Sequence, residues 1–160
     1  MQIPTFAEIA EEFLAAAHSQ VLCSASTLDT QNRLRSRLLH PIWENHADGP
    51  TGWVATTTGS LKTKHLAHNP YMSLCYLNAK DPFKPLYVDC RAEWVEDRDE
   101  KGRICHLFSD TPPPLGYDLL SGLGSVDNPA YALLKLVPWR IELADWYGEA
   151  RVWRALDSSV

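Results

Sequence analysis

The chain has 160 residues, of which 45% are hydrophobic and 22% charged, and its formal net charge is −5. We expect residues 1–160 to form a single domain, because this length allows a real core but is short for two ordinary domains. The mildly acidic balance argues against nucleic-acid binding, which usually needs a broad basic surface, but it allows a local pocket for one small anion. Without a long apolar run, an apolar leader or paired cysteines, we expect a cytoplasmic protein with no membrane span and no disulfide framework.

The first predicted element is an N-terminal amphipathic helix. Thr5 and Glu8 have the spacing of a capping box, in which each side chain bonds the backbone N–H of the other residue. Apolar residues then recur at helical spacing from Phe6 to Ala17, which predicts a helix that ends near His18.

The rest of the chain is rich in short strands. Alternating, β-branched and aromatic residues predict strands over 21–27, 33–44, 52–58, 71–77, 86–96, 133–143 and 146–153. In the second of these, His40-Pro41 interrupts the alternation and requires an edge, a bulge or the end of the strand. Strands and helices do not alternate strictly, so we predict a mainly β fold, an antiparallel barrel with peripheral helices.

Two further helices are predicted, one after the third strand and one after the fifth. The first runs over 61–68, and the second begins at an N-cap formed by Asp97 or Asp99. The proline-rich stretch 111–116 is predicted to be a stiff, extended connector. The segment 117–131 is predicted to form short helical turns and a mobile loop.

The clearest functional signal lies in the segment 52–70. A strand ends near Thr58, and Ser60 is suited to cap the helix that follows. Lys62 and Lys64 fall in the first turn of that helix, where the helix dipole already places positive charge, so an anion would be favoured there. We predict a phosphate site built from Thr56, Thr57, Ser60 and Lys62, with Lys64 nearby. The alternative is a surface helix whose lysines are simply solvated.

A row of arginines precedes this segment. Arg33, Arg35 and Arg37 alternate with other residues along the second predicted strand, so they share one face. Guanidinium groups bind phosphate through two hydrogen bonds, although for the row taken alone a solvent-facing strand is the favoured interpretation. Sequential strands are often neighbours in space, which favours one anion site formed by the arginines and the lysines together.

Three other features are open to two readings each. His65 and His68 lie on one helix face and could ligate a metal, but no third ligand accompanies them, so a surface or dimer-contact role is favoured and no metal site is predicted. His40 could face the arginine pocket or pack within its strand. Trp139-Arg140 could close the pocket of a planar ligand, or consist of a core tryptophan beside a surface arginine.

These segments together resemble the pyridoxamine 5′-phosphate oxidase-like flavoproteins. The resemblance covers roughly residues 12–143 and is carried by Arg35-Ser-Arg37-Leu-Leu39, Gly52-Trp-Val-Ala-Thr56, Ser60-Leu-Lys62, Leu66-Ala-His-Asn-Pro70 and Pro138-Trp-Arg-Ile-Glu-Leu143. It implies an FMN-binding split β-barrel of antiparallel Greek-key type, with the cofactor at a homodimer interface.

By position, the resemblance implies which residues hold FMN. The arginine of Arg37-Leu-Leu39 would contact the phosphate and the two leucines would line the flavin. Thr56 and Thr57 would contact the phosphate and ribityl groups, and the segment 60–62 would cradle the phosphate. The complete predicted cofactor set is Arg35, Arg37, Leu38, Leu39, His40, Thr56, Thr57, Ser60, Leu61, Lys62, Trp139 and Arg140.

The chain departs from the oxidase pattern in places that bear on its substrate. Ile42 stands where the oxidase has a lysine, and Trp146-Tyr-Gly148 and Arg151-Val-Trp153 stand where it has Trp-Gln-Gly and Arg-x-His. The chain is therefore more similar to the short, actinobacterial-type members of the family than to the oxidase itself.

The expected function is an FMN-dependent oxidoreductase acting on a small-molecule substrate that the sequence does not identify. No catalytic acid or base is assigned. One alternative is a deazaflavin-dependent reductase, in which the anionic cofactor tail would also use Arg33 or Lys64. Others are a flavin carrier without turnover and a dimeric scaffold with a vestigial pocket.

Overall fold

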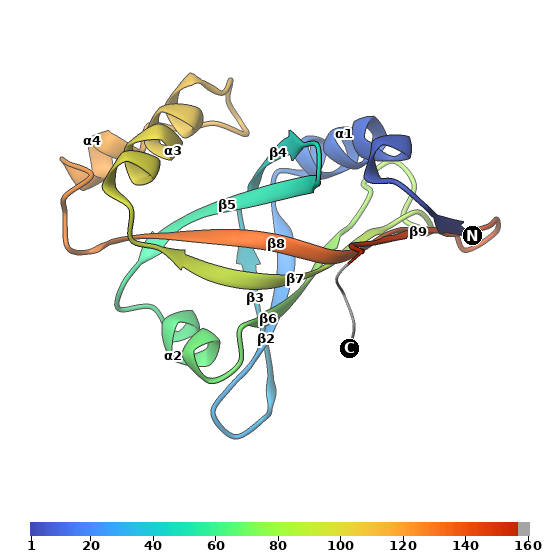
Figure 1. Cartoon of the computed structure of the whole chain (residues 1–160), viewed down its shortest axis with the longest axis horizontal. Helices are drawn as coiled ribbons and strands as arrows, with labels where there is room; N and C mark the ends of the chain where they lie inside the picture. The colour runs from blue at the N-terminus through green and yellow to red at the C-terminus, as the bar shows by residue number, and fades with distance from the viewer. Residues whose placement is uncertain (157–160) are drawn as a thin grey trace.

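The computed structural model describes residues 1–156 and shows a strongly curved sheet flanked by helices (Figure 1). The strands are β1 (Gln2–Ile3), β2 (Cys23–Leu28), β3 (Leu34–Leu39), β4 (Ile42–His46), β5 (Gly49–Thr57), β6 (Tyr71–Tyr76), β7 (Leu86–Val95), β8 (Tyr131–Leu143) and β9 (Arg151–Arg154). The helices are η1 (Phe6–Glu8), α1 (Ala10–Gln20), α2 (Leu61–His68), α3 (Arg98–Asp110) and α4 (Leu119–Leu123). The predicted mainly β fold with peripheral helices is confirmed.

The strands form one mixed sheet with the order β1-β9-β8-β7-β6-β2-β3, and β5 joins it through β8 with β4 on its other side. The first half of β8 pairs with β5 and β7, and its second half pairs with β7 and β9. These pairs are antiparallel, whereas β1 and β9 pair in parallel, which the sequence did not predict. The sheet thus curls from β3 round to β5 as a split barrel.

The segment predicted as one long strand over 33–44 is divided in the structure. Strand β3 ends at Leu39 and pairs with β2, whereas β4 begins at Ile42 and pairs with β5. Proline cannot donate to a ladder of strand hydrogen bonds, so His40-Pro41 is where the chain leaves one side of the barrel for the other. The break was recognised in the sequence, but the change of partner strand was not.

Two apolar clusters stabilise the fold. The larger cluster lies between α1 and the inner face of the sheet, where the rings of Phe13 and Trp43 meet edge to face at 5.2 Å and Trp43 Nε1 donates to Tyr76 Oη at 2.8 Å. The smaller cluster lies beneath α3 and α4 and includes the fully buried Ile104 and Phe108. These clusters fix β5 between them, because its side chains alternate between the two.

The predicted capping residues are found at the N-terminal helix and at α3, but the N-terminal ones cap a different element from the one expected. The capping box of Thr5 and Glu8 is formed, but it opens the short 3₁₀ turn η1, and α1 follows and continues to Gln20. Asp97 caps α3 by accepting a hydrogen bond from the backbone N–H of Glu100.

The prediction of an extended connector over 111–116 was wrong. The N–H of Gly116 donates to Pro112 O at 3.0 Å, and the N–H of Tyr117 donates to Phe108 O at 2.9 Å. The chain therefore folds back against the end of α3. Beyond it, α4 is the short helical turn expected within 117–131.

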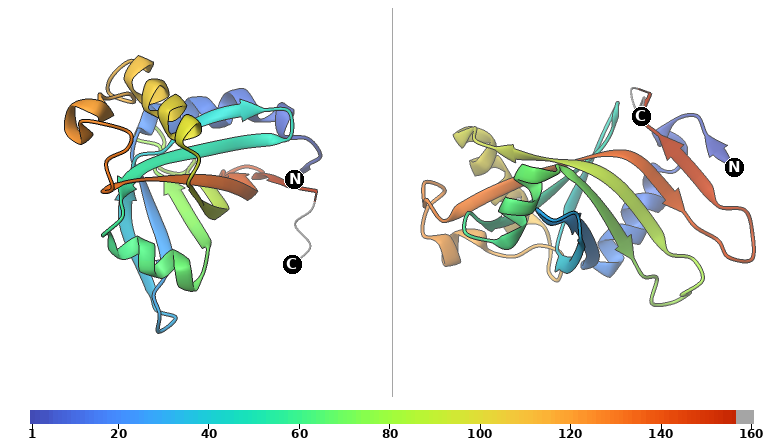
Figure 2. Two further views of the ribbon diagram at one scale, coloured as in Figure 1. Left: turned by 60° about the vertical axis from the view of Figure 1, so that its left-hand side comes forward. Right: turned by 90° about the horizontal axis from the view of Figure 1, so that it is seen from below.

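The helix α2 lies on the opposite side of the β5–β8 layer from α3 and α4, and it covers the end of β2 (Figure 2). This position brings the start of α2, the end of β5 and the inner face of β3 together. Among residues 1–156, no helix combines the length and the apolar character needed to cross a lipid bilayer.

Candidate anion-binding site

The first turn of α2 begins at the residue that the sequence predicts, but its cap differs from the expected one. Ser60 occupies the N-cap position with an extended backbone, yet its hydroxyl makes no capping bond and lies 3.3 Å from Thr63 Oγ1. Within the described chain, the backbone N–H groups of Leu61 and Lys62 have no protein acceptor. Free N–H groups at a helix start attract anions, so this turn is open to a negatively charged group.

The side chain of Lys62 reaches back from α2 to the end of β5. Its ammonium donates to Thr56 Oγ1 at 2.5 Å. Burial lowers the pKa of Lys62, and the positive charge of Arg37 lowers that pKa further. The lysine is therefore held beside a second cation, an arrangement that a bound anion would stabilise.

Arg37 approaches the same place from the inner face of β3. Its Nη2 lies 3.2 Å from Nδ1 of His65, a buried residue of α2. Its Nη1 is also buried and has no hydrogen-bond partner, and burial lowers the pKa of Arg37. Buried charged donors are normally paired. The unpaired Nη1 of Arg37 can therefore donate a hydrogen bond to an acceptor that a ligand supplies.

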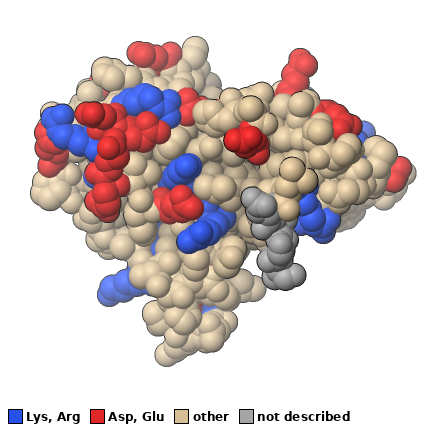
Figure 3. All heavy atoms as spheres, in the orientation of Figure 1, with Lys and Arg blue, Asp and Glu red and all other residues tan. Residues whose placement is uncertain are grey.

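Neither cation is neutralised by the protein. Among the described residues, no carboxylate forms an ion pair with Arg37 or Lys62. On the face seen in Figure 3, acidic and basic side chains are mixed over α3 and α4, whereas the lower part, over α2, is mostly uncharged with basic groups at its edge. The local field therefore favours an anion at this site despite the net negative charge of the chain.

The other two arginines of the predicted row are already paired. Asp29, in the turn after β2, lies 2.9 Å from Arg33 and 3.4 Å from Arg35. Its carboxylate also accepts hydrogen bonds from the backbone N–H groups of Arg33 and Gln31, and these bonds, with the side chain of Arg33, hold its pKa well below the usual range. Among the described residues, Arg37 is the member of the row without a carboxylate partner.

Strand alternation separates several residues of the predicted cofactor set. Thr56 shares its face with Val54 of the larger core, whereas Thr57 lies on the opposite face. Leu39 is 6% exposed within that core, so only its backbone can meet a ligand, whereas Leu38 is 68% exposed on the outside of β3. Leu61 is also largely exposed at the start of α2.

The remaining predicted residues do not join the cluster within one chain. His40 Nε2 donates to Leu115 O at 2.6 Å, and its ring packs against Tyr117. Of the two interpretations of His40, the structure supports a packed residue and not one that faces the arginines. Arg140 pairs with Asp89 and Glu142. The position of Arg140 lies roughly 26 Å along β8 from Ala132, the partner of Thr56, at about 3.3 Å per residue.

Trp139 lines a hollow on the outer face of the sheet together with Leu28, Leu34 and Tyr71, and its buried Nε1 has no partner. The sequence predicted that Trp139 would either close the pocket of a planar ligand or lie in the core, and this placement matches neither prediction. It puts the indole near the β2–β3 hairpin but on the face of the sheet opposite to Arg37.

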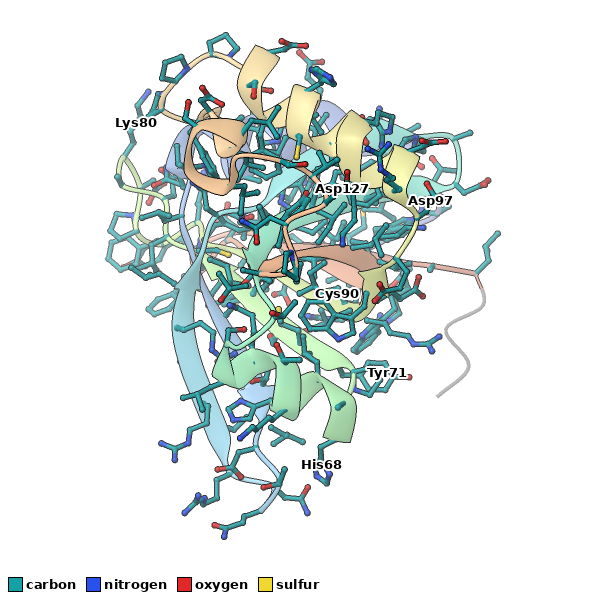
Figure 4. The ribbon with its side chains drawn as sticks, turned by 90° about the vertical axis from the view of Figure 1, so that its left-hand side faces the viewer. His68, Tyr71, Lys80, Cys90, Asp97 and Asp127 are labelled. Carbon is teal, nitrogen blue, oxygen red and sulfur yellow. The ribbon has the colours of Figure 1, made fainter. Side chains whose placement is uncertain are left out.

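The histidines of α2 have separate roles. His68 Nε2 lies 3.0 Å from Asn32 Oδ1 at the tip of the β2–β3 hairpin, and Figure 4 shows it at the end of α2. His65 is buried and contacts Thr27 and Arg37. The surface role favoured for the pair fits His68 and is wrong for His65, whose link to Arg37 the sequence did not reveal.

Solved structures with the same fold bind different cofactors according to their names. An FMN-binding, pyridoxamine 5′-phosphate oxidase-related protein from Nostoc punctiforme matches with a TM-score of 0.64 and 14% identity, over 92% of this chain and 87% of that one. An F420 reductase matches with a TM-score of 0.56 and 15% identity, over 78% and 90%. A heme-binding protein from Mycobacterium smegmatis matches with a TM-score of 0.65 and 19% identity, over 91% and 57%. At these identities the likeness establishes the fold alone.

No curated protein matches the chain closely enough to supply a function. The sequence profile described as pyridoxamine 5′-phosphate oxidase, however, matches residues 9–143, which is most of the chain. The fold, with its split barrel and peripheral helices, agrees with that match. The chain therefore belongs to the pyridoxamine 5′-phosphate oxidase-like family.

Proposed function

We propose that the protein binds FMN and acts as a flavin-dependent oxidoreductase of this family, of a short type distinct from the oxidase itself. The observation that supports FMN is the pair of converging cations, Arg37 and Lys62, which have no carboxylate partner, together with the buried and unpaired Nη1 of Arg37. A phosphate monoester supplies both the negative charge and the acceptor oxygens that these donors lack. The free N–H groups of α2 would complete the cradle.

The same geometry favours FMN over a deazaflavin with a long anionic tail. Such a tail would use additional cations, and the candidates for that role were Arg33 and Lys64. Arg33 is already bound to Asp29, and Lys64 is exposed on α2. Arg37 and Lys62 converge at the start of α2, which suits one terminal phosphate, whereas an extended polyanion would have only the exposed Lys64 beyond them.

When bound, the flavin supplies the redox chemistry, and the residues of this chain bind and orient it. The replacement of the oxidase motif by Trp146-Tyr-Gly148 and Arg151-Val-Trp153 supports a substrate other than pyridoxamine phosphate. A flavin carrier differs from the proposed enzyme in one measurable respect. Bound FMN in the carrier would not be reduced and reoxidised by any donor and acceptor.

We expect Lys62→Ala to weaken FMN binding by at least about tenfold, or about 1.4 kcal/mol, because it removes one of the two phosphate cations. The matched control is Lys64→Ala, which removes an exposed lysine from the same helix and should leave the affinity within about twofold. Flavin fluorescence titration measures both dissociation constants. Equal affinities for Lys62→Ala and the wild type would contradict the phosphate assignment, and binding of F420 but not FMN would contradict the choice of cofactor.

The proposed assembly is a homodimer. Leu34 and Leu38 on the outer side of β3 are 74% and 68% exposed, and a second copy of the chain would cover such large apolar groups. Sedimentation should give a dimer, and Leu38→Glu should shift the protein toward the monomer. Leu156→Glu, at a 99% exposed leucine beyond β9, is the control. A monomer that holds FMN stably would argue against a cofactor site at the interface.

A further inference from the structure

We propose that His65 positions Arg37 for the phosphate, and that it does so as a neutral hydrogen-bond acceptor so that the cradle keeps both of its positive charges. The inference rests on the proposed FMN phosphate site. It assigns a role to a residue that does not itself touch the ligand.

The contacts of His65 determine how its ring is protonated. Nδ1 lies 3.2 Å from Arg37 Nη2 and 3.1 Å from Thr27 Oγ1. A guanidinium group has donors and no acceptor, so Nδ1 must accept, and the proton of the neutral ring is on Nε2. Nδ1 has one lone pair, so the hydroxyl of Thr27 shares it with Arg37. The exposed fractions of His65 and Thr27 are 9% and 2%, so water does not readily replace these bonds.

This bond selects the part of Arg37 that faces the ligand. The guanidinium group is planar and rigid, so fixing Nη2 on α2 also fixes the direction of Nη1, the buried nitrogen without a partner. Lys62 is held in a comparable way, because its ammonium donates to the hydroxyl of Thr56. Both cations are therefore oriented before a ligand arrives, which reduces the ordering that binding requires.

Strand β3 provides an internal comparison between two ways of holding an arginine. Arg33 and Arg35 are held by the carboxylate of Asp29, whose single negative charge offsets part of their combined positive charge. Arg37 is held by an imidazole nitrogen, which leaves its charge intact. An acidic residue at position 65 would hold Arg37 equally well but would place a negative charge beside the phosphate.

Three variants of His65 separate positioning from charge. His65→Asn places an uncharged acceptor near the position of Nδ1, His65→Leu removes the acceptor, and His65→Glu supplies a charged one. The measurement is the ratio of the dissociation constants for riboflavin and FMN, which isolates the phosphate and is insensitive to a general loss of stability. Thermal unfolding of each variant without ligand identifies any that fail to fold.

The wild type should prefer FMN, and His65→Asn should keep that preference within about threefold. His65→Leu should reduce the preference by about tenfold, because Arg37 loses the bond that orients it. His65→Glu should reduce it at least as far, despite retaining a partner for Arg37.

An unchanged ratio in His65→Leu would overturn the positioning role, and an unchanged ratio in His65→Glu would overturn the requirement for a neutral acceptor. Nitrogen NMR of the ligand-free wild type gives an independent check, because a proton on Nδ1 of His65 would also overturn the proposal. A wild type without any preference for FMN over riboflavin would instead remove the proposed phosphate site. The two failures are thus distinguishable.

Discussion

Replacing Arg37 with methionine is expected to weaken FMN binding by about a hundredfold, which corresponds to about 2.7 kcal/mol. Methionine keeps an unbranched apolar side chain in place of the arginine stem and removes the guanidinium group. The expected loss exceeds that for Lys62→Ala because a guanidinium makes two directed hydrogen bonds to a phosphate. Flavin fluorescence titration at fixed ionic strength measures it, since salt screens such interactions.

The same substitution should not lower the stability of the protein without ligand. Burial lowers the pKa of Arg37, so its charged form is destabilised in the folded state, and no described carboxylate offsets this. Removing the guanidinium also removes the positive charge that lowers the pKa of Lys62, which should therefore rise toward its usual value. A structural arginine would behave in the opposite way, with a lower unfolding temperature and unchanged FMN affinity.

Arg33→Met is the control for this experiment. Arg33 precedes the same strand, but its side chain is 60% exposed and is paired with Asp29. FMN affinity should stay within about twofold of the wild type. An equal loss of affinity in Arg33→Met and Arg37→Met would mean that the general positive charge of the hairpin, and not the direction of one guanidinium, binds the phosphate.

The end of β5 and the start of α2 were predictable from the sequence, because residues that are close together in the chain determine them. The end of β5, the N-cap at Ser60 and the proline that follows Asn69 fix the bounds of α2 without reference to the rest of the chain. The alternation of a strand also contained the information that Thr56 and Thr57 face opposite ways. The hydroxyl of Ser60, predicted as a cap, is the local detail that differs.

The remaining part of the site depends on contacts between distant segments. The sequence presents Arg33, Arg35 and Arg37 as equivalent, and only the fold shows that Asp29 takes the first two. His65 acquires its role from β2 and β3, which the sequence spacing with His68 does not indicate. Long-range pairing of this kind decides which cation remains available, so the phosphate site was predictable as a region but not as a set of contacts.

The second large effect is expected at Gly116, where the connector after α3 was predicted incorrectly. Gly116→Ala should lower the free energy of unfolding by about 3 kcal/mol, which is near the upper end of the usual cost of adding atoms to a well-packed region. A Cβ atom there would lie 1.8 Å from Thr111 O and 2.6 Å from Phe108 O. These are backbone atoms at the end of α3, so they cannot move aside without unwinding the helix or displacing Leu115, which bonds His40.

Gly102→Ala is the matched control for Gly116→Ala, because it makes the same substitution within α3. A Cβ atom at Gly102 would meet nothing within 4 Å. Alanine is favoured over glycine in a helix interior, so this variant should raise the free energy of unfolding by about 0.5–1 kcal/mol. Chemical denaturation of both variants measures the two changes, which should have opposite signs. A loss at Gly116 no greater than that of an ordinary surface substitution would show that the connector is not packed against α3, and that His40 is not held there.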